Sequence, residues 1–115
     1  MRSIILGKVD KILKTGYFLS DIGVNNWALP FDKALNALLQ FEKWEIPVVG
    51  GDVCELKDGI FQYNYDNWYC EQKDNESHQD FVVRSIEKAK SFIINYKIQN
   101  ADRISFVFVL DTEFV

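Results

Sequence analysis

Three segments of the chain place apolar residues at the 3.6-residue spacing of an amphipathic helix. The first covers residues 3–14 and ends before Gly16, a residue suited to the position after a helix end. The second covers residues 31–44 and follows Pro30, which is well tolerated where a helix begins. The third covers residues 80–97. The apolar positions of these segments are Ile5, Val9, Ile12, Leu13, Phe31, Leu35, Leu38, Leu39, Val82, Ile86, Ala89, Ile93 and Tyr96.

After Pro47 the pattern changes to the β-branched and alternating composition that is typical of strands. Residues 48–66 hold an Asp58-Gly59 pair between two such runs, which predicts a β-hairpin. A third strand is expected near residues 68–72, and the apolar run at 104–110 predicts a C-terminal strand in a central position. Residues 15–30 are expected to form a structured loop with buried aromatic residues. The fold class is therefore α+β, with a single sheet of about four strands and three helices packed on it.

Two registers are compatible with the hairpin. A two-residue loop at Asp58-Gly59 gives the pairs Leu56–Phe61, Cys54–Tyr63 and Asp52–Tyr65. A three-residue loop that includes Lys57 instead places Val53 opposite Tyr63 and Gly51 opposite Tyr65, which exchanges the two faces of the strand. We favour the two-residue loop, because it separates apolar from polar side chains better.

The Gly50-Gly51 pair interrupts the first strand of the hairpin. Without Cβ atoms, the backbone here can form a bulge or be covered closely by an aromatic ring. A phosphate-binding loop is not expected, because no Lys-Ser/Thr pair and no helix start follow the glycines.

Length and composition predict one globular domain spanning residues 1–115, with 48% hydrophobic and 26% charged residues. No apolar run approaches the roughly 18 residues of a membrane span. The N-terminal residues hold only a three-residue apolar run before charge returns, so no signal peptide is expected. The formal net charge of −4 argues against direct binding of nucleic acid.

The negative charge is concentrated in the middle of the chain. Residues 51–80 hold eight acidic residues against two lysines, a local charge of −6, so the rest of the chain carries about +2. Aromatic density peaks in the same region, with five aromatic residues among the nine from Phe61 to Tyr69. The bland interpretation is a solvated polar surface. The functional one is a surface that attracts a basic partner.

The sequence offers little for catalysis or metal binding. Cys54 and Cys70 are the only cysteines and His78 the only histidine, so the ligand spacings of a zinc site are missing. We expect both cysteines to be reduced and unbridged. A carboxylate pair such as Asp52 with Asp66 could hold Mg²⁺, yet this region is poor in the cations that would bind a phosphate substrate. No enzymatic activity, cofactor or metal is therefore expected.

The residues expected to bind a partner combine carboxylates with one aromatic side chain. Tyrosine and tryptophan beside carboxylates make good anchors in protein interfaces. For Trp68 a position in the core and a position in the interface both remain open. The candidate partner-binding residues are Asp52, Glu55, Asp66, Trp68, Glu71 and Asp74.

Four stretches of the chain, in order, resemble immunity protein family 40 of bacterial polymorphic toxin systems. They are GYFLSDIGVNNWALPFDKAL, VVGGDV, YDNWYCE and RSIEKAKSFI, within residues 16–110. The most specific parts are the Gly50-Gly51-Asp52 triplet and the surroundings of Trp27 and Trp68.

The resemblance implies a cytoplasmic α+β protein that binds and neutralises a cognate toxin domain by stoichiometric complex formation. The expected partner is the C-terminal domain of the toxin; if this domain is a nuclease, its basic cleft would complement the acidic region. The alternatives are a generic intracellular protein-interaction module and a small enzyme that uses the acidic region. The resemblance does not identify the toxin or the oligomeric state.

Overall fold

The computed structural model describes residues 2–96 and 101–112. It contains three α-helices and two 3-10 helices among these residues: α1 (Arg2–Leu13), α2 (Phe31–Lys43), α3 (His78–Asn95), η1 (Leu19–Ile22) and η2 (Ala101–Arg103). The strands are β1 (Tyr17–Phe18), β2 (Trp27–Pro30), β3 (Val48–Lys57), β4 (Ile60–Tyr69) and β5 (Ile104–Leu110). The α+β class predicted from the sequence is confirmed.

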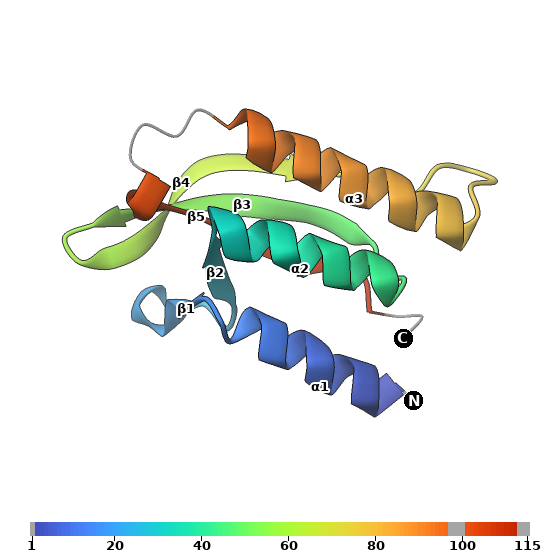
Figure 1. Cartoon of the computed structure of the whole chain (residues 1–115). Coiled ribbons are helices and arrows are strands. Elements are labelled where there is room, and N and C mark those ends of the chain that lie inside the picture. Colours follow the sequence, from blue (N-terminus) through green and yellow to red (C-terminus); the bar gives the residue numbers. More distant parts are fainter. Residues whose placement is uncertain (1, 97–100, 113–115) are drawn as a thin grey trace.

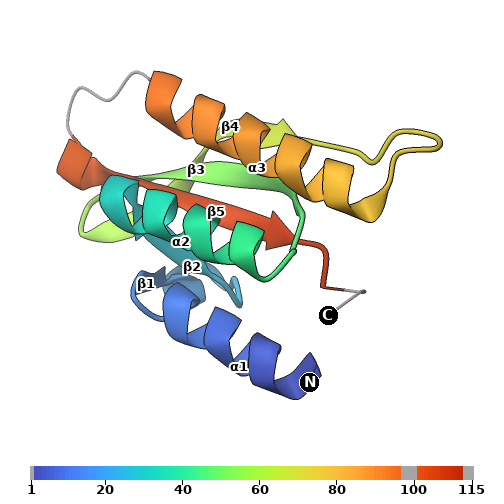
Figure 2. The same ribbon diagram turned by 45° about the vertical axis from the view of Figure 1, so that its right-hand side comes forward.

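The strands form one antiparallel sheet with the order β1-β2-β5-β3-β4. The helices α1, α2 and α3 lie side by side on one face of this sheet, with α2 in the middle (Figure 1; Figure 2). Strand β5 lies between β2 and β3, as its nearly continuous apolar sequence predicts. The main core lies between the helices and this face of the sheet.

All three helices form close to their predicted bounds. The third begins at His78 rather than near residue 80, because the Ser77 side chain accepts a hydrogen bond from the Asp80 backbone N–H at 3.1 Å and so caps the helix. The end predicted at residue 97 lies outside the described residues, and the helix ends at Asn95.

The strands of the structure differ from the prediction more than the helices do. The separate strand expected near residues 68–72 is the end of β4, which continues unbroken from Ile60 to Tyr69. The expected loop at 15–30 contains β1 and β2, so the sheet has five strands rather than about four. Its aromatic residues are not all buried, because Tyr17 and Phe18 lie on the short edge strand and are exposed. Tyr17 instead contacts Phe61 with its ring, and Phe18 contacts Trp27.

The hairpin has the predicted two-residue loop. Asp58 and Gly59 both have positive φ angles, 54° and 78°, as a tight hairpin turn with the right twist requires. The pairs Leu56–Phe61 and Cys54–Tyr63 are confirmed.

The predicted pair Asp52–Tyr65 is wrong, because β4 bulges between the two. Asp52 lies opposite Asn67, so residues 64–66 of β4 face the single residue Val53 of β3. The bulge shifts the register by two residues, which preserves the face on which each later side chain lies. It brings Trp68 opposite Gly51.

Trp68 packs its indole ring directly onto Gly51, where β3 has no side chain. A Cβ atom at Gly51 would lie 2.1 Å from Cη2 of the ring. The ring stacks on Phe92 of α3, with centroids 4.7 Å apart, and meets the edge of Phe108 of β5 at 6.1 Å. The indole Nε1 is buried without a hydrogen-bond partner among the described residues, a cost of about 1–3 kcal/mol that the packing of the ring must outweigh. Of the two alternatives for the glycine pair, close cover by an aromatic ring is therefore found at Gly51, and the register of β3 against β5 shifts between Val48 and Gly50, as a bulge requires.

Gly51→Ala is expected to lower the free energy of unfolding by about 1–3 kcal/mol, because the new methyl group forces the Trp68 ring to move. Urea denaturation followed by tryptophan fluorescence measures the change. Gly7→Ala in α1 is the matched control: nothing lies within 4 Å of the added atom, and alanine there raises stability by up to about 1 kcal/mol. Equal stability of Gly51→Ala and the wild type would contradict the packing described.

Candidate protein-binding surface

The face of the sheet turned away from the helices is defined by the strand register. Residues directly opposite each other in antiparallel strands share a face. Asp52 lies opposite Asn67 of β4 and Val107 of β5, and Gly50 lies opposite Tyr69 and Val109. Gly51 and Trp68, one residue along each strand, belong to the helix-covered face. We call the surface formed by Gly50, Asp52, Asn67, Tyr69 and Val109 the open face.

One side of this face is covered by η1 and the segment after it. Leu19, Ile22 and Val24 pack there in a small second core. From the sheet, the second core receives Ala28, Cys54, Val107, Phe61 and Tyr63. Beyond it the side chains emerge into solvent: Tyr69 is 67% exposed and Val109 is 46% exposed. The open face is therefore a partly apolar surface bounded on one side by a rigid core.

Asp52 is half-buried at the boundary between the second core and the open face. None of the described residues donates a hydrogen bond to its carboxylate or forms an ion pair with it. Burial raises the pKa of the Asp52 carboxyl above its ordinary value. Burial also raises the pKa of Tyr63, and the charge of Asp52 raises it further. The Asp52 carboxylate thus bears a desolvation cost that no cation of the described residues offsets.

The β4 bulge is a second exposed feature, next to the open face. Tyr65 has a φ angle of 73°, which is rare for a bulky residue, and its side chain is 88% exposed. The Asp66 backbone N–H donates to the Asn64 side chain at 3.0 Å, and the Asn67 side chain donates to the Tyr65 carbonyl at 3.0 Å. These bonds hold the backbone of the bulge in its unusual conformation.

The bulge is also bound to the end of α3. The Tyr96 hydroxyl donates to the Asp66 carboxylate at 2.6 Å and accepts from the Asn64 side chain at 2.9 Å. Burial and the hydrogen bond to Asp66 raise the pKa of Tyr96. A cavity of about 560 Å³ opens between the bulge and the helix, lined by Asp66, Asn67, Ser91, Phe92, Asn95 and Tyr96. Tyr65 and Asp66 are therefore presented by a fixed rather than a loose segment.

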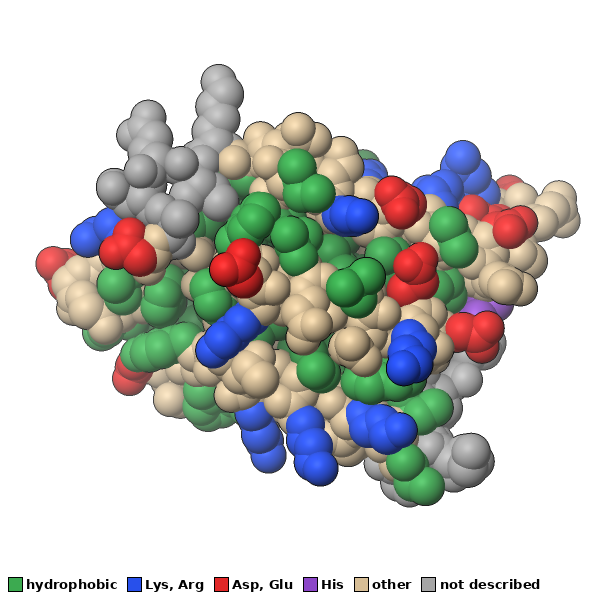
Figure 3. Space-filling model, in the orientation of Figure 1, with side chains coloured by type: hydrophobic (Ala, Val, Ile, Leu, Met, Phe, Trp, Pro, Cys, Tyr) green, Lys and Arg blue, Asp and Glu red, His purple; other side chains and the backbone are tan. Residues whose placement is uncertain are grey.

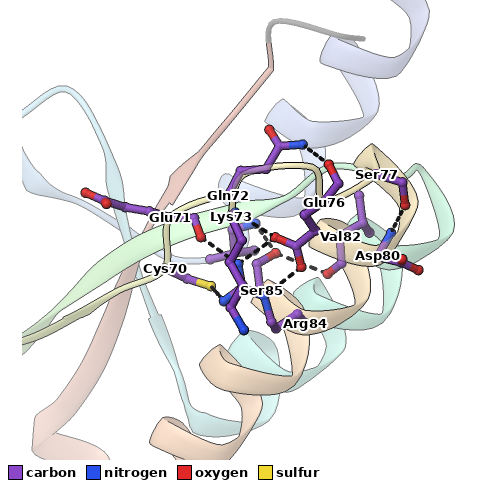
Figure 4. Close-up of polar contacts among 11 residues, drawn as sticks. Cys70, Glu71, Gln72, Lys73, Glu76, Ser77, Asp80, Val82, Arg84 and Ser85 are labelled. Carbon is purple, nitrogen blue, oxygen red and sulfur yellow. Dashed lines mark hydrogen bonds and ion pairs between the residues drawn. The ribbon is translucent and has the colours of Figure 1, made fainter.

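The loop between β4 and α3 is organised by Arg84 (Figure 4). Its guanidinium group donates to both carboxylate oxygens of Glu76, at 2.8 and 2.7 Å, and also to Cys70 Sγ and the Glu71 carbonyl. The hydrogen bonds from Arg84, and one from the Lys73 backbone, lower the pKa of Glu76 to about 2. The side chains of Glu71 and Asp74 in the same loop are exposed.

The structure therefore does not gather the six predicted partner-binding residues on one surface. Trp68 is only 6% exposed and belongs to the core. Glu55 lies opposite Ile104 and Gln62 on the helix-covered face, whereas Asp52 lies on the other face of the same strand. Asp66, Glu71 and Asp74 are exposed along the end of β4 and the following loop.

Sequence reasoning missed Tyr69 and Val109, the two exposed residues of the open face that lie opposite Gly50. Tyr69 was counted only as part of the aromatic run. Val109 lies in the strand at 104–110, for which the sequence predicts only a central position in the sheet. The signal was present in the alternation of β5, where Phe106 and Phe108 face the helices and the smaller Val107 and Val109 face away.

The described residues hold no group of three or more His, Cys, Asp or Glu side chains placed to bind a metal ion. Both cysteines are free and buried, as expected. Burial, together with the nearby Asp52 charge, raises the pKa of the Cys54 thiol to about 12, so this thiol is protonated at neutral pH. Within the described chain, no helix has both the length and the apolar character needed to cross a membrane.

The helix-covered side of the molecule differs in charge from the β4 region. Figure 3 looks onto the helices and shows Lys and Arg side chains gathered along the lower margin, over α1, with Asp and Glu scattered elsewhere. The basic residues of α1 include Lys8 and Lys11, and Lys14 directly follows the helix. This side is therefore less suited to a basic partner than the open face and the β4 bulge.

Fold and surface together define a small two-layer α+β protein whose most prominent exposed features are an uncovered sheet face and a rigid, aromatic bulge. The chain belongs to the immunity protein 40 family, whose family model matches residues 18–110. The match includes all of β2 to β5 and thus the whole open face, while α1 lies outside it. No curated protein and no solved structure matches the chain.

Glu76→Gln is expected to lower the melting temperature by several degrees at pH 7, because it removes the carboxylate that Arg84 binds with two hydrogen bonds. The pKa of Glu76 in the folded protein, about 2, lies below its ordinary value of 4.5. The ionised group therefore stabilises the fold above pH 4.5, and this contribution is lost as the pH falls towards 2. Thermal melts of both proteins between pH 7 and pH 2 should converge at the acid end. Asp74→Asn, which removes an exposed carboxylate of the same loop, is the control; an equal effect of both variants would contradict the prediction.

Proposed function

We propose that this chain binds and neutralises a cognate bacterial toxin domain by forming a stoichiometric complex, without catalysis. Membership of the immunity protein 40 family is the observation that carries the proposal. In this proposal the protein acts in the cytoplasm of the cell that produces the toxin, and its partner is the C-terminal toxin domain.

The surface around β4 supports a binding function. Tyr65 and Tyr69 are exposed by 88% and 67%, although apolar and aromatic rings normally gain stability by burial. Tyrosine is enriched among the residues that dominate binding energy in interfaces. The hydrogen bonds of the bulge fix its backbone in advance, which reduces the entropy lost when a partner binds.

The exposed carboxylates in this region support a basic partner. Asp66, Glu71 and Asp74 follow one another along the end of β4 and the next loop, and they are exposed to solvent. Exposed charges at the margin of an interface mainly raise the rate of association with a partner of opposite charge. A toxin that acts on nucleic acid would supply such charge in the cleft that binds phosphates.

Co-expression with the C-terminal domain of a toxin encoded beside this chain tests the proposal. The toxin domain alone should arrest growth, and the wild-type chain should restore it. The purified proteins should form a complex of fixed stoichiometry in size-exclusion chromatography. Growth arrest that the chain does not relieve, with no complex formed, would refute the proposed function.

Reversal of the marginal charges tests the role of electrostatics. The double variant Asp66→Lys/Glu71→Lys should reduce the association rate at low salt by about tenfold and weaken its dependence on ionic strength. Stopped-flow or surface-plasmon measurements at several salt concentrations give both quantities. The double variant Asp10→Lys/Asp32→Lys makes the same change of charge in α1 and α2 and should have a smaller effect. An unchanged association rate for Asp66→Lys/Glu71→Lys would remove the acidic region from the interface.

A further inference from the structure

We propose that the open face is the docking surface for the toxin domain, and that Asp52, at the boundary of this face with the second core, receives an arginine side chain of this partner. The inference rests on the proposed function and specifies which face of the molecule carries it. Neither the family description nor the acidic composition of residues 51–80 selects this face over the others.

The open face lacks the cover of α-helices that the other face of the sheet has. All three α-helices lie on the opposite face of the sheet (Figure 1; Figure 2). The second core protects only the side of the open face that is closest to η1. Tyr69 and Val109, which lie opposite the same residue of β3, are left exposed by 67% and 46%. A sheet face with large side chains gains stability when it is covered.

The Asp52 carboxylate is placed where it loses hydration. It is half-buried between Asn67 and Val107 on the neighbouring strands, yet no described residue pairs with it. A carboxylate that loses part of its hydration without gaining a partner is unfavourable in the unbound protein. A cation from a docked partner would remove this cost and gain a charge-assisted hydrogen bond. Because Asp52 is partly buried, salt would screen this ion pair less than it screens ion pairs of the exposed carboxylates.

The side chains around Asp52 suit a guanidinium group. Side chains directly opposite on neighbouring strands have Cβ atoms about 5 Å apart, so the Asn67 amide lies within reach of a group bound to Asp52. Tyr63 and Tyr69 lie on either side along β4 on the same face. The Lys88 ammonium of α3 already lies over the Tyr69 ring, 5.1 Å from its centroid, so the other side of that ring and the Tyr63 ring are left for a guanidinium group. A planar guanidinium group can form two hydrogen bonds to a carboxylate while it stacks on a tyrosine ring.

A second copy of this chain is a poorer occupant of the same surface. A closed dimer formed through this face would be two-fold symmetric and would bury the two copies of Asp52 in one interface. Two partly buried carboxylates without a cation between them repel each other. A basic side chain of another protein would form an ion pair with Asp52, whereas self-association would bury two carboxylates without a cation.

The decisive variant is Asp52→Asn, which keeps the shape of the side chain and removes its charge. The probe is the purified C-terminal domain of the neighbouring toxin, in a catalytically inactive form. The dissociation constant should rise by about 30-fold or more, mainly through faster dissociation. The melting temperature of the unbound variant should be unchanged or higher, because an unpaired carboxylate is lost. Glu55→Gln removes a carboxylate from the other face of the same strand and should bind the toxin as the wild type does.

A second pair of variants tests the face without touching Asp52. Val109→Lys places a cation on the open face, and Val83→Lys places one on α3. The two valines are equally exposed, at 46% and 47%. Val109→Lys should prevent complex formation and rescue of growth, whereas Val83→Lys should permit both.

The outcomes separate this inference from the proposed function. If the wild-type chain does not bind the toxin domain, the proposed function fails and the inference fails with it. If the wild type binds while Asp52→Asn and Val109→Lys bind equally well, the function stands and the open face is not the docking surface. Loss of binding in Val83→Lys alone would assign docking to the helices. A wild-type dimer that Val109→Lys dissociates, measured by analytical ultracentrifugation, would give the face to a second copy and also overturn the inference.

Discussion

The packing of Trp68 on Gly51 is the contact on which the arrangement of this molecule depends. A tryptophan ring can approach a strand as closely as Trp68 does only where the residue beneath has no side chain, and β3 meets this condition at Gly51. Once the ring lies there it contacts both Phe92 of α3 and Phe108 of β5, and so it joins the hairpin to the helix and to the central strand. Alternation along β3 and β4 then turns the neighbouring side chains, Asp52 and Asn67, to the opposite face. The same contact therefore stabilises the core and determines which polar groups the open face presents.

The bulge of β4 makes this contact possible. In an uninterrupted hairpin with the same turn, Asp66 would lie opposite Gly51, and a charged side chain would enter the core. Two extra residues in β4 bring Trp68 to this position and leave every later side chain on its original face. The cost is the left-handed backbone of Tyr65 and the exposure of its ring, and the hydrogen bonds among Asn64, Asp66 and Tyr96 offset part of it. The bulge that brings Trp68 into the core thus also exposes the Tyr65 ring beside the open face.

Periodicity and turn chemistry predicted the helices, the Asp58-Gly59 turn and the pairs next to it, because these features depend on residues close in sequence. The bulge could not be predicted in this way. The alternation of Phe61, Tyr63 and Tyr65 with polar residues is compatible both with an uninterrupted β4 and with a β4 that bulges after Tyr63. What distinguishes the registers is the fit of Trp68 to Gly51, a contact between residues 17 positions apart whose value depends on α3 and β5 as well. The strands β1 and β2 were missed for a similar reason, because two and four residues carry too little pattern to show a strand. Of the six predicted partner-binding residues, Asp52 is on the open face, but Trp68 and Glu55 are on the helix-covered one. Successive side chains of a strand point to opposite faces, so residues that are close in sequence do not share a surface.

Only some of the acidic residues in the segment 51–80 contribute to an acidic surface. Of its eight carboxylates, Glu76 is bound by Arg84, Asp80 lies in the first turn of α3 where it favours the helix dipole, Asp58 forms the hairpin turn and Glu55 faces the helices. The other four carboxylates are those of Asp52, Asp66, Glu71 and Asp74, and they differ in physical character. Asp66, Glu71 and Asp74 are exposed, so salt and water screen them and their effect falls mainly on the rate of association. Asp52 is half-buried and has no partner among the described residues, so a cation that reaches it gains more and is harder to release. In the proposed complex, attraction and retention of the partner would therefore fall to different carboxylates of the same region, which a count of charges along the sequence does not separate.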